Sequence, residues 1–275
     1  MVKAARRLLR QVDFSVNPAR VFRNYTAIRK FLRDRDDFYS QYRADPDRAF
    51  AAGTLFPCIS DHAEAGGSAK GHYFHQDLLV AQLVYRNNPS RHVDVGSRID
   101  GFVAHVAAFR HIDVFDIREV STSASNIGFT VKDLMSGAAD LAACTDSLSS
   151  LHTLEHFGLG RYGDPVDYRG YEKGLSALAE MLAAGGCLYL SVPISERQRF
   201  EFNAHRVFAL PFLLATFPRF GLSVERFDYV DDEGELHTSV DFTGGEAMRI
   251  FGLSYGCGIF TLRKGALAGG RQNDA

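Results

Sequence analysis

The stretch HVDVGSRIDGFVAHVAAFRHIDVFDIRE, residues 92–119, carries the strongest structural signal in this sequence. A β-rich run ends at Val95, a turn holds Gly96 and Gly101, a helical pattern follows, and a second strand pattern ends at Asp116. Glycine lets the backbone approach a ligand closely, and the helix after it presents free N–H groups. An acidic residue about 20 positions beyond such a turn can accept both hydroxyls of a ribose. We therefore expect a nucleotide site here.

Strand and helix patterns alternate along the chain from this stretch onward. Strands are expected at His92–Val95, His111–Asp116, Gly128–Lys132, Ser147–Leu151, Cys187–Val192, Leu222–Val230 and Gly258–Arg263, and helices at Gly101–Arg110, Tyr168–Ala184 and Asn203–Phe217. Such alternation predicts a mostly parallel sheet with helices on both faces and ligands at the carboxyl ends of the strands. No helical pattern separates the last two strands. The sequence therefore predicts a Rossmann-like α/β fold with a seven-stranded sheet and an antiparallel edge strand.

The chain ahead of this sheet has a different character. Residues 1–50 contain twelve Lys and Arg against six Asp and Glu, although the whole chain has a net charge of −2. Asn17-Pro18 is typical of a helix start, and the apolar spacing predicts one helix over residues 18–43 and another over residues 72–85. We expect a helical extension or lid at residues 1–88, the sheet domain at residues 89–264, and a disordered tail at residues 265–275.

Composition excludes several classes of protein. A hydrophobic fraction of 46% without an apolar run of ~18 residues argues against an integral membrane protein. The four cysteines are far apart and form no CxxC pair, which argues against a disulfide framework and a structural zinc ribbon. A cytoplasmic location is expected. The basic N-terminus does not resemble a signal peptide, and it could be a lid, a solvated helix, a peripheral membrane contact or the arm of a homodimer.

From about His92 to the last strand, the chain resembles class I S-adenosylmethionine (SAM) dependent methyltransferases. Their first strand and loop follow the pattern Asp, apolar, Gly, x, Gly, x, Gly, and the matching stretch is Asp94-Val95-Gly96-Ser97-Arg98-Ile99-Asp100, with Gly101 displaced by one. The resemblance implies a methyltransferase fold with SAM as cofactor, bound near Asp94, Gly96, Ser97, Arg98 and Gly101. The overall pattern is similar to a bacterial methyltransferase-like family of unknown function, of a kind associated with sugar and cell-surface polysaccharide modification.

The same resemblance gives roles to residues after the second and third strands. Asp116 would bind the ribose, Ile117 would lie against the adenine, and Asp133-Leu134 would approach the adenine edge, where Asp133 could accept from the exocyclic amine. Each acid could instead be a simple helix or loop cap. The absence of a phosphate-cradling pattern suits a cofactor without phosphates.

A third segment, residues 149–156 (SSLHTLEH), resembles the strand end and Leu-Glu-His segment of many small-molecule methyltransferases. By that resemblance, His152 would line the cofactor site, while Glu155 and His156 would lie near the sulfonium and the acceptor entrance. The same letters match H-x-x-E-H, a zinc hydrolase pattern that needs a continuous helix and a third ligand. A strand pattern precedes the motif and glycines follow it, so no metal is expected.

Two further groups are candidates for contact with the acceptor. His205 and Arg206 lie where this fold can contact a substrate, and His205 is the candidate base because imidazole exchanges a proton near neutral pH. Tyr73 and His75 belong to a polar and aromatic cluster on the helix that often covers the SAM site. All four could instead be structural or solvent-facing residues.

These patterns together predict a SAM-dependent methyltransferase that acts on a small molecule or a saccharide. A catalytically degenerate binding module remains an alternative, because Arg98 and Asp100 bring side chains into the glycine turn. Zinc hydrolysis through His152, Glu155 and His156 is a third possibility. A nucleic-acid partner is not expected, since the chain beyond residue 50 is acidic and would repel phosphates.

Overall fold

The computed structural model describes residues 18–47, 49–58, 66–120, 123–243 and 252–265. It divides into two compact units, Met1–Ser68 and Ala69–Ala275. In the first unit, helix α2 runs without interruption over Pro18–Ala44, which confirms the helix predicted there. The predictions for residues 1–17 and for the tail beyond Gly265 fall outside the described residues.

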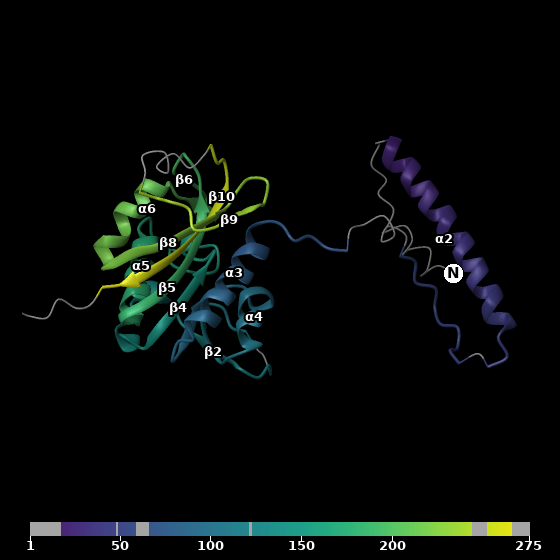
Figure 1. The fold of residues 1–275 in the computed structure, drawn as a ribbon, viewed down its shortest axis with the longest axis horizontal. Helices are drawn as coiled ribbons and strands as arrows, with labels where there is room; N and C mark the ends of the chain where they lie inside the picture. The colour runs from purple at the N-terminus through teal and green to yellow at the C-terminus, as the bar shows by residue number, and fades with distance from the viewer. Residues whose placement is uncertain (1–17, 48, 59–65, 121–122, 244–251, 266–275) are drawn as a thin grey trace, which may run out of the picture. The chain divides into compact units, whose positions relative to one another are not determined.

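The second unit is built on one large sheet (Figure 1). Its strand order among the described residues is β3-β2-β1-β4-β5-β10-β8-β9. Strands β1 to β5 pair in parallel, β10 is antiparallel to both β5 and β8, and β9 is antiparallel to β8. The strands are β1 His92–Val95, β2 Ile112–Asp116, β3 Ile127–Val131, β4 Thr145–Leu151, β5 Leu182–Ile194, β8 Leu222–Val230, β9 Leu236–His237 and β10 Gly256–Lys264. The predicted Rossmann-like sheet with an antiparallel edge is confirmed, and the short β9 makes an eighth strand.

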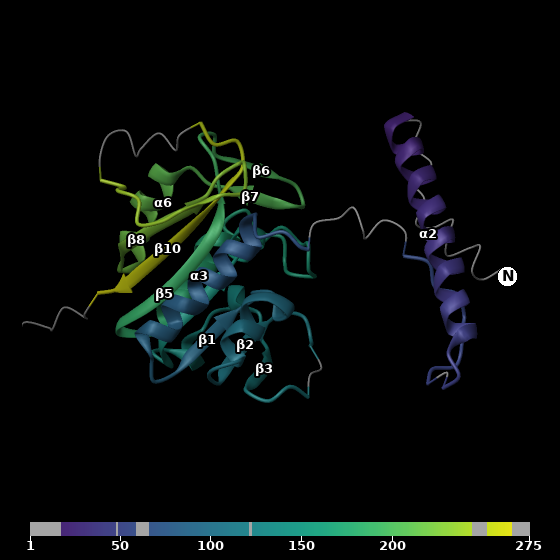
Figure 2. The same ribbon diagram turned by 45° about the vertical axis from the view of Figure 1, so that its right-hand side comes forward.

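Helices cover both faces of this sheet, as its alternating sequence pattern requires. Helix α3 (His72–Asn87) lies across one face together with α4 (Ala104–Ala107), and α5 (Gly170–Met181) and α6 (Leu210–Thr216) lie on the other (Figures 1 and 2). Val80 and Val84 of α3 are completely buried among residues of the sheet. Helix α3 is therefore part of the second unit, which begins before the predicted domain boundary at residue 88.

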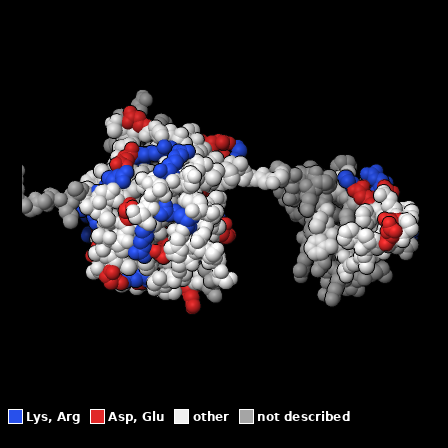
Figure 3. Space-filling model, turned by 60° about the horizontal axis from the view of Figure 1, so that its bottom comes forward, with Lys and Arg blue, Asp and Glu red and all other residues white. Residues whose placement is uncertain are grey.

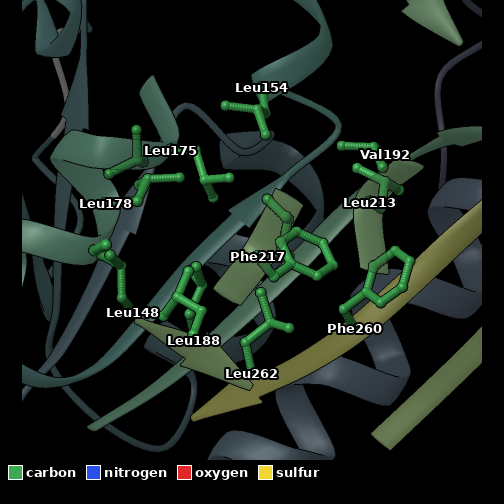
Figure 4. Packing of buried hydrophobic residues seen from close by; sticks show 14 of the residues in the cluster. Leu148, Leu154, Leu175, Leu178, Leu188, Val192, Leu213, Phe217, Phe260 and Leu262 are labelled. Atoms are coloured by element: carbon green, nitrogen blue, oxygen red, sulfur yellow. The ribbon is translucent and has the colours of Figure 1, made fainter. Parts of the chain in front are cut away.

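The larger core fills the α5 and α6 face. Leu175 and Leu178 of α5 meet Leu148 and Leu188 of the sheet, while Phe260 packs on the α6 side (Figure 4). Burying a side chain of this size stabilises the fold by about 1.5–3 kcal/mol. Because this core holds the central strands rigidly, their carboxyl ends can present polar side chains in fixed positions.

Two predicted helices differ from the observed structure. After β1 the chain forms a π turn, η2 (Ile99–Val103), before α4, so the expected helix over Gly101–Arg110 is shorter and irregular. The helix predicted over Asn203–Phe217 is wrong in its first half. Strand β7 (His205–Val207) pairs there with β6 (Arg199–Glu201). The consecutive side chains of Arg206 and Val207 are both buried, which does not match the one-sided burial of a surface helix. Helix α6 then starts at a proline-containing first turn.

Candidate active site

The turn after β1 requires glycine at two positions, Gly96 and Gly101. Gly96 has φ of +70°, a left-handed conformation that costs a residue with a side chain roughly 1–2 kcal/mol. A Cβ atom at this position would also collide with the side chain of Thr153. A Cβ atom at Gly101 would collide with the carboxylate of Asp77 from α3. Both positions therefore require glycine, Gly96 beside the pocket-lining Thr153 and Gly101 where the turn packs against α3.

Asp94, in strand β1, stabilises this turn through hydrogen bonds. Its completely buried carboxylate accepts hydrogen bonds from the Ser97 hydroxyl (2.6 Å), the Ser97 amide (3.0 Å) and the Ser149 hydroxyl (2.6 Å). The Ser97 hydroxyl in turn accepts from the amide of Leu151 at 3.0 Å. Burial raises the pKa of Asp94 to about 6, although these hydrogen bonds oppose the rise. Asp94 and Ser97 thus position the turn and tie it to β4.

Asp116 lies at the end of β2, and the sequence predicts that it binds the ribose of the cofactor. Both its carboxylate oxygens are engaged by Arg118: Oδ1 accepts from Nε at 3.0 Å and from the amide at 2.8 Å, and Oδ2 accepts from Nη2 at 2.8 Å. The guanidinium of Arg118 also lies 4.3 Å from the ring centroid of Tyr162. A ligand that uses both oxygens of Asp116 must therefore displace the Arg118 side chain.

A pocket of about 590 Å³, open to solvent, joins these groups at the carboxyl ends of β1 to β4. Of the predicted site residues, those lining it are Gly96, Asp116, Ile117, Asp133, Leu134, His152 and His156. Asp133 caps the short turn η3 (Leu134–Ser136) by accepting from the amide of Met135 through Oδ1. Its capping role and a ligand role are compatible, because a carboxylate has a second oxygen.

The end of β4 brings a second polar group to the pocket. His152 follows β4 with φ of +50°, and the short turn η5 (Leu154–His156) begins two residues later. The helix that the zinc hydrolase pattern requires across residues 152–156 is therefore absent from this described segment. The imidazole Nδ1 of His152 lies 2.8 Å from Oε1 of Glu155, and both side chains are buried. Burial lowers the pKa of His152, but Cys257 and Glu155 outweigh that effect and raise it well above the usual range.

A row of stacked rings extends from His152 away from the nucleotide pocket. His72 stacks on His152 with ring centroids 5.4 Å apart, and Tyr255 stacks on His72 at 5.5 Å. Tyr73 contacts the His152 ring at 5.2 Å, and His205 contacts Tyr255 at 5.3 Å. The structure therefore brings predicted residues from α3, β4 and β7 together. Two members were not predicted as site residues: Tyr255, which is far along the chain from the motifs, and His72, although it directly precedes the predicted Tyr73.

Several predicted residues take other positions. Arg98 pairs with Asp100 at 3.0 Å at the rim of the turn, and its guanidinium lies over Tyr73. Arg206 is buried and donates to the carbonyl oxygens of residues 155, 157, 167 and 168, so it braces a loop instead of facing a substrate. His156 bonds the carbonyl of Ala204 through Nδ1 at 2.7 Å. His75 stands in α3 outside the pocket lining, in an edge contact with Phe74.

Several other side chains line the pocket that the sequence patterns did not indicate. Phe115 and Met135 supply apolar walls, and Thr153 packs against the glycine turn. Tyr162 and Asp164 come from the loop after η5, where Asp164 accepts from the amides of residues 158, 160 and 162. The glycines in this loop could have suggested a close approach to the pocket, but nothing in the pattern specified which strand ends the loop would cover.

Comparisons with known proteins agree with this geometry. A family model described as "Caenorhabditis protein of unknown function, DUF268" matches residues 114–238, from within β2 to just past β9. No curated protein sequence matched the chain. Among solved structures, the [4+2]-cyclase SpnF is similar with a TM-score of 0.50 and 15% identity, over 70% of this chain and 81% of that chain.

Two methyltransferase structures are similar as well. The 1,6-didemethyltoxoflavin-N1-methyltransferase of Burkholderia thailandensis, solved with 1,6-didemethyltoxoflavin and S-adenosylhomocysteine, has a TM-score of 0.47 and 15% identity over 93% of this chain and 94% of that chain. N-methyltransferase NodS from Bradyrhizobium japonicum WM9, in complex with S-adenosylhomocysteine, has a TM-score of 0.46 and 11% identity over 70% and 88%. The order of the sheet, with parallel strands and an antiparallel edge, gives the second unit a Rossmann-like methyltransferase fold, as does its similarity to SpnF.

Proposed function

We propose that this protein is a SAM-dependent methyltransferase that acts on a small molecule or a saccharide. One observation carries the proposal: the carboxylate of Asp116, the side-chain-free turn at Gly96 and the free oxygen of Asp133 all border a single pocket. The two basic side chains that line this pocket are both paired, Arg118 with Asp116 and Lys132 with Asp140. Because no Lys or Arg among the described lining residues is left without an acidic partner, the pocket suits a cofactor that has no phosphates.

The residues present fit SAM at each of its parts. Asp116 would accept the two ribose hydroxyls, Ile117 would lie against the adenine, and Asp133 would accept from its exocyclic amine. Gly96 provides room that a side chain would fill. His152 and Thr153 line the same pocket from the end of β4, where the methionine part would extend. When bound, SAM supplies an electrophilic methyl group.

The chain's own contribution to the reaction would be positioning and proton transfer. The ring row of Tyr73, His152, His72, Tyr255 and His205 forms an aromatic surface beside the pocket on which an acceptor can lie. His205 Nε2 is 3.2 Å from Oε2 of Glu201, a contact that orients the ring. His205 would take the proton of an acceptor hydroxyl or amine, and alignment of the acceptor would supply most of the rate increase.

Surface charge supports a small acceptor. On the face seen in Figure 3, Lys and Arg side chains of the second unit are interspersed with Asp and Glu instead of forming a continuous basic surface. An extended polyanion is bound through such basic surfaces. None of the helices within the described ranges has the length and apolarity needed to cross a membrane. We propose action in the cytoplasm, and the N-terminal unit could add a peripheral membrane contact or a homodimer arm.

A catalytically inactive binding module is the second candidate. The specific observation in its favour is that Arg118 already satisfies both oxygens of Asp116. SpnF, which shares this fold, bears the name of a cyclase, so the fold by itself does not define methyl transfer. This candidate predicts either no SAM binding or binding without turnover.

Calorimetric titration with SAM and with S-adenosylhomocysteine tests the proposal. We expect micromolar binding that falls at least ~100-fold in an Asp116→Ala variant, because buried hydrogen bonds to charged groups contribute about 1.5–3 kcal/mol each. Asp113→Ala is the matched control, since Asp113 belongs to the same strand and pairs with Arg91, but it does not line the pocket. Absence of binding to the unmodified chain would refute the enzyme assignment. Binding without methyl transfer to hydroxylated small molecules or saccharides would favour the inactive module.

A further inference from the structure

Three potential metal ligands converge beside the ring row. One ligand atom each from His72, His152 and Cys257 lies within 4.8 Å of the other two. These residues come from the start of α3, the end of β4 and the start of β10. Ligand atoms around a tetrahedral zinc ion lie roughly 3.5 Å apart, as follows from bond lengths of about 2.0–2.3 Å. The three atoms therefore need to close by only about an ångström to hold an ion.

Burial makes this group unusual. The side chain of His152 is 5% exposed, and Nε2 has no hydrogen-bond partner among the described residues. Cys257 is completely buried; its sulfur makes long contacts with Oε1 of Gln76 (3.6 Å) and the carbonyl oxygen of Gly258 (3.9 Å), and it interacts with the His152 ring. Burying a polar nitrogen without a partner is costly. A ligand that binds this nitrogen would remove that cost.

Glu155 supplies the support that metal-bound histidines usually have. Its Oε1 lies 2.8 Å from Nδ1 of His152, so Nδ1 donates to the carboxylate, and Nε2 offers its lone pair once a metal ion displaces its proton. A carboxylate behind the imidazole is the usual partner of a histidine that binds zinc, where it fixes the tautomer and the ring orientation. Here the Glu155 carboxylate contacts one side of the His152 imidazole, and the Cys257 thiol lies near the ring as a second potential ligand.

We propose that His72, His152 and Cys257 bind a zinc ion. Two imidazoles and one thiolate are ligands of a set that favours zinc among common divalent cations. Three protein ligands leave one tetrahedral position for a water molecule. This site differs from the H-x-x-E-H pattern, because it uses neither His156 as a ligand nor Glu155 as a base.

The ring of His72 is the part that must move. It now stacks parallel to His152, with an interplanar angle of 4°, so both rings cannot point at one ion without a rotation. His72 is half-buried and is the first residue of α3, directly after Gly71. To bind the ion, the His72 ring must leave its stack between His152 and Tyr255. Zinc binding would fix the N-terminus of α3 against β4 and β10.

A nucleophilic cysteine is the competing interpretation of these residues, since Cys257, His152 and Glu155 have the order of a cysteine hydrolase triad. Complete burial of Cys257 argues against it, because a substrate carbonyl cannot reach the sulfur. A buried thiol is no obstacle to a metal, which becomes buried together with its ligands.

Metal analysis of the full chain, stripped with a chelator and reloaded with zinc, tests the proposal. We expect one zinc ion per chain, and a loss of affinity of at least ~100-fold in His72→Gln and Cys257→Ser variants. His75→Gln is the control on the same helix, and Cys187→Ser is the control for a buried cysteine in the neighbouring strand. Both controls should retain zinc. Zinc retained equally in all four variants, or absent from the unmodified chain, would overturn the proposal.

Cobalt substitution keeps the test decisive if a variant fails to fold. Cobalt(II) in the unmodified chain should give a thiolate-to-cobalt charge-transfer band and the strong visible absorption of a tetrahedral site. A spectrum without the thiolate band would exclude Cys257 as a ligand and refute the site. Glu155→Gln should retain the ion with roughly 10–100-fold lower affinity, measured by competition with a chelating dye. Unchanged affinity in this variant would contradict the positioning role of Glu155.

Discussion

The site has a nucleotide half, the pocket that Asp116 and Asp133 border, and a ring half, the ring row with Glu155 and Cys257. The two halves differ in whether their polar groups have hydrogen-bond partners. In the nucleotide half, Asp116 and Asp133 are paired with groups two residues further along the chain, the Arg118 side chain and the Met135 amide. In the ring half, His152 and Glu155 come from one turn, but His72 and Cys257 join them from distant segments. Nε2 of His152 and Oε2 of Glu155 remain without a hydrogen-bond partner in the part of the chain that the structure describes.

This difference separates two ways of preparing a site. A ligand in the nucleotide half exchanges one partner for another, because Arg118 is about half exposed and can be solvated when it leaves. A ligand in the ring half would instead satisfy groups that are already desolvated. Leaving such groups unpaired costs about 1–3 kcal/mol each. The first half should therefore bind reversibly and adapt to its ligand, while the second should hold an ion tightly.

The largest expected effect is at the glycine turn. Gly96→Val should abolish SAM binding, by more than ~100-fold, and lower the free energy of unfolding by about 2–4 kcal/mol, because it adds both left-handed strain and a collision with Thr153. Calorimetry and urea unfolding measure the two effects. Gly221→Val is the matched control: it has the same φ of +70° but nothing within 4 Å of the added Cβ. An equal loss of stability in both variants would show that backbone strain alone is responsible.

The next effect concerns the buried acid below the turn. The pKa of Asp94 is raised to about 6 in the folded protein. Between about pH 4 and pH 6, the folded state therefore keeps the Asp94 proton, whereas the unfolded state has released it. The free energy of unfolding should therefore fall as pH rises through this window, by up to about 3 kcal/mol. Asp94→Asn should lack this contribution. Urea unfolding of both proteins across the window measures the difference.

Asp113→Asn serves as the control with the opposite sign. Burial raises the pKa of Asp113, but Arg91 and His111 outweigh it and hold the pKa below its usual value. The stability contributed by Asp113 is therefore present above the unfolded pKa and is lost as pH falls through the lower, folded value. A slope of the same sign for both residues would contradict the assigned environments.

A smaller effect is expected from Arg118, whose side chain is paired with Asp116, the residue proposed to bind the ribose. Arg118→Ala should strengthen SAM binding by up to ~5-fold, because the ligand no longer has to displace a half-exposed guanidinium whose ion pair contributes about 1 kcal/mol. Calorimetry compares the variant with Arg161→Ala, which also removes a cation beside Tyr162 but leaves Asp116 paired. Weaker binding in Arg118→Ala would show that the guanidinium contacts the cofactor and does not compete with it.

The nucleotide half was predictable because its signal is local. One strand, one glycine turn and one acid 20 residues later fix Gly96 and Asp116 at neighbouring strand ends, since parallel strands order their carboxyl ends along one edge. The sheet was predicted for the same reason. The helix predicted from Asn203 failed because apolar spacing around His205 and Val207 does not distinguish a short buried strand from a helix.

The ring half could not be predicted from patterns of this kind. His72 and Cys257 are separated from His152 along the chain, and they meet it only because α3 crosses the sheet and β10 inserts between β5 and β8. Cysteine spacing suggested no metal, since the proposed site takes one cysteine only. Arg118 was overlooked because nothing local shows that a side chain two residues beyond the ribose acid folds back over it.

The smallest expected effect tests whether the two halves are independent. Cys257→Ser should leave SAM affinity within about 2-fold of the unmodified protein, because Cys257 does not line the nucleotide pocket. His152→Ala should weaken SAM binding, since His152 lines that pocket and belongs to the ring row as well. Calorimetry on zinc-loaded and zinc-free protein measures both. If Cys257→Ser weakened SAM binding as much as His152→Ala does, the halves would be coupled through His152, and zinc would act as part of the cofactor site.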